Sequence, residues 1–211
     1  MLLCVYLCLS PIASGLSLGL DPRMQAKTTF LQSITSGEST GATNAALDVL
    51  VALQSEVSVV TPLEQSNDSL GTWQICFAPH IRVLSRLLQT DFDVLYIFQP
   101  NQVLLSNVRY TSSLFGSGHL STNGSYTLQA TEAGEQVCKI KWNRIWWDVS
   151  DDAPTLEGDI DKHILPTVIQ VVGKAAFVEG VSVFPVQYLD QDLCVFLFRL
   201  LGTRICAKRI A

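Results

Sequence analysis

The stretch TDFDVLYIFQPNQVLLSNVRYTSSLFGSGHLSTNGSYTLQA, residues 90–130, decides the fold, because apolar and polar side chains alternate along it between turn residues. From Phe92 to Phe98 an apolar side chain stands at every second position, which is typical of a strand with one buried face. Pro100-Asn101 then predicts a turn into a second strand, Val103–Tyr110. Two strands joined by so short a connection pair antiparallel.

The end of this stretch contains the dipeptide Asn123-Gly124, a strong signal for a two-residue hairpin turn. It predicts a hairpin between strands 119–122 and 125–130. Further strand-like runs lie at 72–78, 136–142, 145–149, 181–188, 192–198 and 203–210. Many short strands separated by turn signals predict a mainly β protein, an antiparallel barrel or sandwich.

Two helices are expected beside the strands. Residues 45–57 place Ala46, Leu50, Leu53 and Val57 at helical spacing, with Thr43 or Asn44 as the N-cap. A second, short helix is expected within 159–177, beginning near Pro166. The strand residues 195–198 are apolar on both faces, so we expect the N-terminal helix to cover their outer face.

The N-terminal residues resemble a targeting sequence rather than part of the folded domain. Residues 1–20 carry no charge and contain the apolar run Leu2–Leu9, which resembles a signal-peptide core. Residues 21–44 are rich in Ser and Thr and poor in acids, as in a transit peptide, and a flexible linker is the alternative. We therefore expect residues 1–42 to lie outside the fold and the folded domain to span 45–211.

Composition excludes several classes of protein. Hydrophobic residues make up 48% and charged residues 16% of the 211-residue chain, which excludes an intrinsically disordered protein. A net charge of −5 argues against a nucleic-acid binder, since such a domain carries a basic face.

No constellation of residues indicates catalysis. Gly37-Glu38-Ser39-Thr40-Gly41 matches the G-x-S-x-G nucleophile elbow, but the buried strands that an elbow requires do not precede it. The three His residues are isolated and the Cys residues lack C-x2-C spacing, so we expect no metal and no cofactor. The carboxylates at 151–152 and 159–161 read as a solvated loop. We predict that the protein is not an enzyme.

Four cysteines lie beyond the leader. They are Cys76, Cys138, Cys194 and Cys206. Free buried thiols are the simpler interpretation, and two disulfides in an oxidising compartment are the alternative. If the numbers of paired residues in the last hairpin add up to about 400, Cys194 lies opposite Cys206, with about 4.5–5.5 Å between their Cβ atoms. That separation exceeds the roughly 3.8 Å of a disulfide.

Short motifs at both ends of the predicted barrel carry a resemblance to a known family. Gly71-Thr72-Trp73 in the first strand resembles the G-x-W of lipocalin-like barrels, where the indole closes the floor beneath a basic residue of the last strand. Residues 188–193, YLDQDL, followed by Leu201-Gly202-Thr203 and Lys208-Arg209, are similar to the C-terminal signature of plastid-lipid-associated proteins, the plastid fibrillins. The resemblance covers about Ala45 to Arg209.

The resemblance implies a non-catalytic lipid-binding or structural protein of plastid lipid bodies (plastoglobules) or thylakoids. Such a protein would be peripheral to the membrane or lipid-body surface and would hold carotenoids, quinones or similar prenyl lipids. It implies no catalytic residues. Gly71, Trp73 and Arg209 would close the barrel.

The expected ligand site is the barrel interior. Its inward aromatic side chains would form an apolar pocket, with Arg109 or Arg209 as anchor for a polar head group. The aromatic side chains expected there are Trp73, Phe77, Phe92, Tyr96 and Phe98. The simpler alternative is that these residues only fill the core.

Two other functions remain open from the sequence. A secreted, glycosylated lipocalin-like carrier is suggested by the sequons Asn67-Asp68-Ser69 and Asn123-Gly124-Ser125. An enzyme of isoprenoid or lipid metabolism would need a cluster of polar groups inside the barrel.

Overall fold

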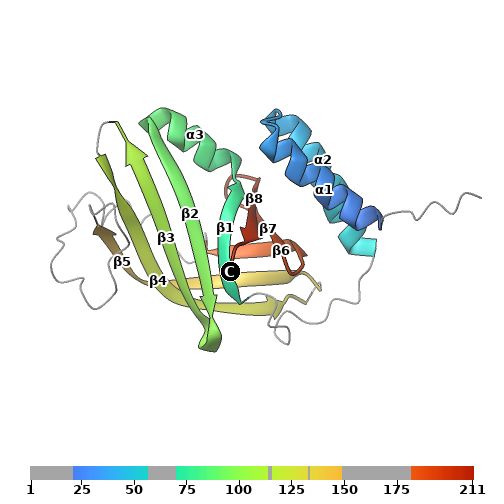
Figure 1. The fold of residues 1–211 in the computed structure, drawn as a ribbon. Coiled ribbons are helices and arrows are strands. Elements are labelled where there is room, and N and C mark those ends of the chain that lie inside the picture. Colours follow the sequence, from blue (N-terminus) through green and yellow to red (C-terminus); the bar gives the residue numbers. More distant parts are fainter. Residues whose placement is uncertain (1–20, 57–69, 114–115, 133, 149–181) are drawn as a thin grey trace, which may run out of the picture.

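The computed structural model describes residues 21–56, 70–113, 116–132, 134–148 and 182–211. Its strands form a closed barrel in which each strand pairs antiparallel with its neighbours along the chain and β1 pairs with β8 (Figure 1). The predicted lipocalin-like antiparallel barrel is therefore confirmed. The strands are β1 Gly71–Phe77, β2 Thr90–Gln99, β3 Val103–Ser112, β4 Gly116–Ala130, β5 Gln136–Asp148, β6 Val183–Leu189, β7 Leu193–Phe198 and β8 Thr203–Arg209.

Three α-helices accompany the barrel in the described ranges: α1 Pro22–Thr35, α2 Thr40–Glu56 and α3 Pro79–Leu88. α1 and α2 lie side by side against the β6–β8 side, and α3 lies across one end of the barrel (Figure 1). None of the helices in the described part combines the length and apolar character needed to cross a membrane.

The N-terminal boundary of the fold was predicted too late. The prediction that residues 1–42 lie outside the fold is wrong from Pro22 onward, because α1 packs Phe30, fully buried, against the barrel. α2 also begins before the predicted N-cap: the Ser39 hydroxyl accepts a hydrogen bond from the backbone N–H of Ala42 at 3.3 Å. Ser39 is thus a helix cap in the turn between α1 and α2.

The predicted hairpin at Asn123-Gly124 is wrong. β4 runs straight through these residues, and the irregularity lies in β5, where Asn123 pairs with Arg144 but Gly124 pairs with Trp142. A Cβ atom at Gly124 would lie 2.3 Å from the Lys141 carbonyl oxygen, so this glycine permits a close approach of two strands rather than a turn. Four predicted segments therefore merge into two long strands, β4 and β5.

β7 separates two apolar clusters, as its doubly apolar sequence predicts. Val195 lies with Phe30, Leu47 and Leu50 in the cluster between barrel and helices, so the expected covering of this strand is confirmed. Cys194 lies with Trp73 and other residues in the cluster inside the barrel.

The last hairpin is antiparallel as predicted, but its register differs by one residue. Cys194 pairs with Ala207 and Val195 pairs with Cys206. Because successive side chains of a strand point to opposite faces, Cys194 faces the barrel interior and Cys206 faces the helices. The predicted opposition of these two thiols is wrong, and all four described cysteines are free.

The second helix, expected within 159–177, lies outside the described residues. No helix is predicted from the sequence at 79–88, where the structure has α3 directly after β1. Pro79 occupies the first turn of α3, where its missing N–H costs no hydrogen bond.

Candidate ligand site in the barrel

The barrel is closed at one end by residues from its first and last strands. Gly71 has φ +122°, and a Cβ atom there would lie 2.5 Å from the Ala211 carbonyl oxygen, so only glycine fits. Trp73 is 2% exposed, and the guanidinium carbon of Arg209 lies 4.9 Å from its ring centroid, within cation–π range. Arg209 also donates a hydrogen bond from Nη2 to the Leu70 carbonyl oxygen at 2.7 Å. The structure thus brings Gly71, Trp73 and Arg209 together as the barrel floor.

Two cavities of about 20 Å³ each lie inside the barrel. They share Tyr96, Phe98, Cys138 and Phe196, and no charged side chain lines either of them. The first is lined by Trp73, Tyr96, Phe98, Leu128, Cys138, Val186, Leu189, Cys194, Phe196 and Ala207. The second is lined by Tyr96, Phe98, Cys138, Ile140, Phe184, Phe196 and Ile205.

The size of these cavities limits what the closed barrel can hold. A cavity of 20 Å³ admits about one water molecule, whereas small-molecule sites are typically about 300–1,000 Å³. A ligand larger than water must therefore displace the side chains between the two cavities. Tyr96, Phe98 and Phe196 stand between them, so their rotation would join the two spaces.

Three of the five predicted aromatic residues line this site: Trp73, Tyr96 and Phe98. Phe77 does not. A bulge between Ile75 and Phe77, where β1 pairs with β8, turns Phe77 outward, and its ring meets that of Phe30 edge-on at 6.2 Å between centroids. Phe92 lies on the inward face of β2, two residues before Val94, and lines neither cavity.

Arg109 stands on the outer face of β3. In the strand register it lies opposite Asp93 of β2 and His119 of β4. Its neighbours along β3, Val108 and Tyr110, are the residues that face inward. Its side chain is exposed, so it is not an anchor inside the barrel.

Most of the site's wall comes from the C-terminal strands, which the sequence analysis did not assign to it. Cys194 and Phe196 of β7 and Ala207 of β8 line the first cavity. Alternation along β7 could have marked them, but its outward positions are apolar too, so the pattern alone identifies no inner face. The register with β8 supplies that information.

The chemistry of the interior is neutral. Burial raises the pKa of the Cys138 thiol to about 12. Burial, with a smaller effect from Cys138, raises the pKa of Tyr96 to about 12 as well. Neither group ionises near pH 7, so this wall offers apolar contact rather than acid–base chemistry.

A larger hollow of about 540 Å³ opens on the surface, lined by residues of β4 and β5 and by Ser182 and Val183 at the start of β6. There Lys139 pairs with Val183, and the backbone N–H of Ile140 donates a hydrogen bond to the Ser182 carbonyl oxygen at 2.9 Å. Ile140 lines both this hollow and the second interior cavity. Lys139 and Lys141, both exposed, stand at its rim and give it a positive edge.

Other candidate sites from the sequence gain no support. In the described part of the chain, no three His, Cys, Asp or Glu side chains group as metal ligands would. Asn123 of the second sequon is half-buried within β4, whereas a glycosylated asparagine lies on the surface. The first sequon, His163 and the carboxylates at 151–152 and 159–161 lie outside the described residues.

Searches for related proteins add no assignment. No protein-family model matches the chain, and no curated protein matches it. The features on which a function can be based are a closed eight-strand barrel, two small cavities inside it that no charged side chain lines, and a lysine-edged hollow at its side.

Proposed function

We propose that the protein is a non-catalytic lipid-binding protein that holds the apolar chain of a prenyl lipid, such as a quinone or a carotenoid, inside its barrel. The observation that carries the proposal is the wall of the two adjoining cavities, which is aromatic and aliphatic apart from the thiols of Cys138 and Cys194. Burying an apolar chain there would stabilise the complex by roughly 25 cal/mol per Å² removed from water.

The geometry favours a slender ligand with a polar head. A single isoprenoid or acyl chain is narrower than a fused-ring ligand, so it would displace fewer of the side chains that the two cavities share, among them Tyr96, Phe98 and Phe196. The hollow lined by β4, β5 and the start of β6 offers a place for the head group, since Lys139 and Lys141 can donate hydrogen bonds to carbonyl or anionic oxygens.

We further propose a plastid lipid body or thylakoid as the site of action. This part of the proposal is supported by the fibrillin-like motifs and by the signal-like leader at residues 1–20. A fluorescent fusion of the full chain is expected to label plastids. Accumulation in the culture medium would instead favour the secreted carrier.

Fluorescence titration with decyl-benzoquinone, a short-chain prenylquinone analogue, tests the binding directly. Quinones quench tryptophan, and Trp73 lines the first cavity, so we expect saturable quenching with one site. Trp73→Phe should lose much of the quenching while calorimetry still reports binding.

A matched pair of variants locates the ligand. Ala207→Phe adds a ring to the cavity wall and should abolish binding, whereas Leu197→Phe adds a ring to the outer face of neighbouring β7 and should leave it unchanged. Overpacking typically costs about 1–3 kcal/mol, so thermal melts accompany both variants. Unchanged quinone affinity in a folded Ala207→Phe protein would rule out the barrel as the site.

A further inference from the structure

α3 exposes a continuous apolar surface although it is only ten residues long. Val83 is 64% exposed, Leu84 44%, Leu87 76% and Leu88 37%, and no residue of this helix is buried. Isolated exposed apolar residues are ordinary, but four together on one helix mark an interaction site.

The orientation of α3 directs this surface away from the barrel. Ile81 and Ser85, four residues apart, are half-buried and mark the side that faces the barrel. Val83 and Leu87, also four apart, lie on the opposite side of the helix. Their side chains therefore project into solvent.

The turn between β7 and β8 extends this surface. Leu200 is 67% exposed and Leu201 54%. The turn lies beside the start of α3, because His80 Nδ1 is 3.0 Å from the Thr203 hydroxyl and the His80 ring is 5.2 Å from that of Phe198. The six residues Val83, Leu84, Leu87, Leu88, Leu200 and Leu201 are named here the α3 face.

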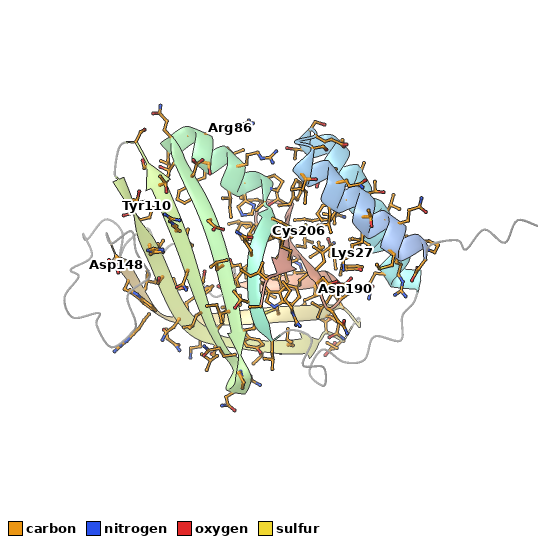
Figure 2. The ribbon with its side chains drawn as sticks, in the orientation of Figure 1. Lys27, Arg86, Tyr110, Asp148, Asp190 and Cys206 are labelled. Atoms are coloured by element: carbon orange, nitrogen blue, oxygen red, sulfur yellow. The ribbon has the colours of Figure 1, made fainter. Side chains whose placement is uncertain are left out.

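The charge at the edge of the α3 face is positive. Arg82 and Arg86, one turn apart and both exposed, follow one side of the helix, and no acidic residue occurs from Pro79 to Gln89. Among the described residues neither guanidinium forms an ion pair with a carboxylate. Figure 2 labels Arg86 on α3 at the end of the barrel. A chain of net charge −5 thus places uncompensated positive charge beside its exposed apolar helix.

We propose that the α3 face docks on an anionic lipid surface. α3 would lie in the plane of the interface, with Val83 and Leu87 among the acyl chains and Arg82 and Arg86 on anionic head groups. This inference rests on the proposed function for its purpose, since a lipid-binding barrel has to meet the surface that supplies its ligand.

The topology agrees with this arrangement. β1 runs from Gly71 at the barrel floor to Phe77, where α3 follows, and β8 runs back from the β7–β8 turn to Arg209 at the floor. The α3 face and the floor are therefore at opposite ends of the barrel. Docking through α3 turns the floor toward water.

Vesicle flotation with the full chain tests the proposal. The protein is expected to float with phosphatidylcholine vesicles that contain phosphatidylglycerol, and to float weakly with phosphatidylcholine alone. Val83→Asp combined with Leu87→Asp should lower the partition coefficient at least tenfold. Arg82→Gln combined with Arg86→Gln should lower it roughly 20- to 30-fold on the anionic vesicles alone, at about fivefold per guanidinium.

Two controls separate this proposal from the others. Met24→Asp combined with Val49→Asp places the same two charges on exposed positions of α1 and α2, each 55% exposed in the native protein, and should leave flotation unchanged. Ala207→Phe, which fills the cavity, should float like the native protein, so that loss of ligand binding and loss of docking remain distinguishable.

Two results would overturn the proposal. One is unchanged flotation of the Val83→Asp/Leu87→Asp protein. The other is a native protein that sediments as a dimer, fails to float, and becomes monomeric in that double variant, because a second copy of the chain would then cover the α3 face.

Discussion

Lys27 of α1 holds the carboxylate of Asp190 in the β6–β7 turn, across 163 residues of sequence: its Nζ lies 2.8 Å from Oδ2 and 3.1 Å from Oδ1 (Figure 2). Lys27 also donates to Asp192 Oδ2 at 3.0 Å. Asp190 accepts further hydrogen bonds from the Tyr188 hydroxyl at 2.6 Å and from the backbone N–H groups of Asp192 and Leu193, each at 2.8 Å. The YLDQDL segment therefore anchors the N-terminal helix to the barrel.

Lys27→Met should destabilise the fold by about 2 kcal/mol, because it leaves two carboxylates without their cation while the apolar stem is kept. Urea unfolding measures the change. Arg23→Met is the control: Arg23 pairs with Asp21 at 3.7 Å in an exposed position, and its loss should change stability by less than about 0.5 kcal/mol. Equal effects of the two substitutions would contradict an anchoring role for Lys27.

The same cluster makes the free energy of unfolding depend on pH in the acidic range. Burial alone would raise the pKa of Asp190, but hydrogen bonds from Lys27, Tyr188 and two backbone N–H groups outweigh it and hold the pKa below 3.8. A carboxyl group with a lowered folded-state pKa stabilises the fold above its unfolded value and loses that contribution as the pH falls through the folded value. We expect Asp190→Asn to flatten the loss of stability below about pH 3.8 in urea unfolding. A profile identical to that of the native protein would contradict this.

The pKa of Lys27 determines how the stability of the fold changes at alkaline pH. Burial alone would lower its pKa, but the hydrogen bonds and charges of Asp190 and Asp192 raise it above 10.5. The stabilisation is therefore full below that value and is lost as the pH rises through the folded-state pKa. Near-ultraviolet circular dichroism should show that the native protein loses tertiary structure above about pH 10.5. The Lys27→Met protein should not show this pH-dependent loss.

Trp73→Ala should destabilise the barrel by about 3–5 kcal/mol, since it removes a large buried aromatic side chain from the floor. Chemical denaturation measures the loss. A loss below about 1 kcal/mol would mean that the indole contributes little to closure.

Two glycine substitutions should have opposite signs. Gly71→Ala forces a Cβ atom against the Ala211 carbonyl oxygen at a positive φ and should cost about 2 kcal/mol or more. Gly41→Ala in α2 meets nothing nearer than the Ser39 hydroxyl at 3.9 Å and should stabilise by about 0.5 kcal/mol through helix propensity. Thermal melts of the two variants test the pair, and a Gly71→Ala protein as stable as the native one would contradict the role assigned to Gly71.

The described cysteines should resist labelling in the native state. Burial raises the pKa of Cys76 to about 11 and places those of Cys194 and Cys206 well above their usual value, so few thiolates form near pH 7. Alkylation followed by peptide mass mapping should show slow labelling that becomes fast in denaturant. Recovery of a Cys194–Cys206 bridged peptide would contradict their placement on opposite faces of the sheet.

The sequence predicted those features that depend on local alternation. The inward positions of Tyr96 and Phe98 follow from the period of two along β2, and the covering of Val195 follows from a strand that is apolar on both faces. The placement of Phe77 could not be found in this way, because the bulge that turns it outward is set by pairing with β8, far along the chain.

Features stabilised by distant partners were missed for a similar reason. α1 has few apolar positions, and its buried face includes Lys27 and Ser33, so its sequence alone shows no broad apolar stripe. Its stability comes from Phe30 in the shared cluster and from Asp190 on the barrel. At Asn123-Gly124 the local signal predicted a turn that the structure does not have. The dipeptide instead lies within β4, opposite the point where the register with β5 shifts by one residue.

The closure of the barrel through β1 and β8 has a consequence for how the chain is made. Arg209 and Leu70 are bonded across 139 residues, so at a synthesis rate of about 5–20 residues per second β1 exists for roughly 7–28 seconds before its partner has been translated. During that interval the N–H and C=O groups on one edge of β1 have no strand to pair with, and such an edge templates aggregation. The length of this interval is fixed by the positions of the two closing strands in the sequence.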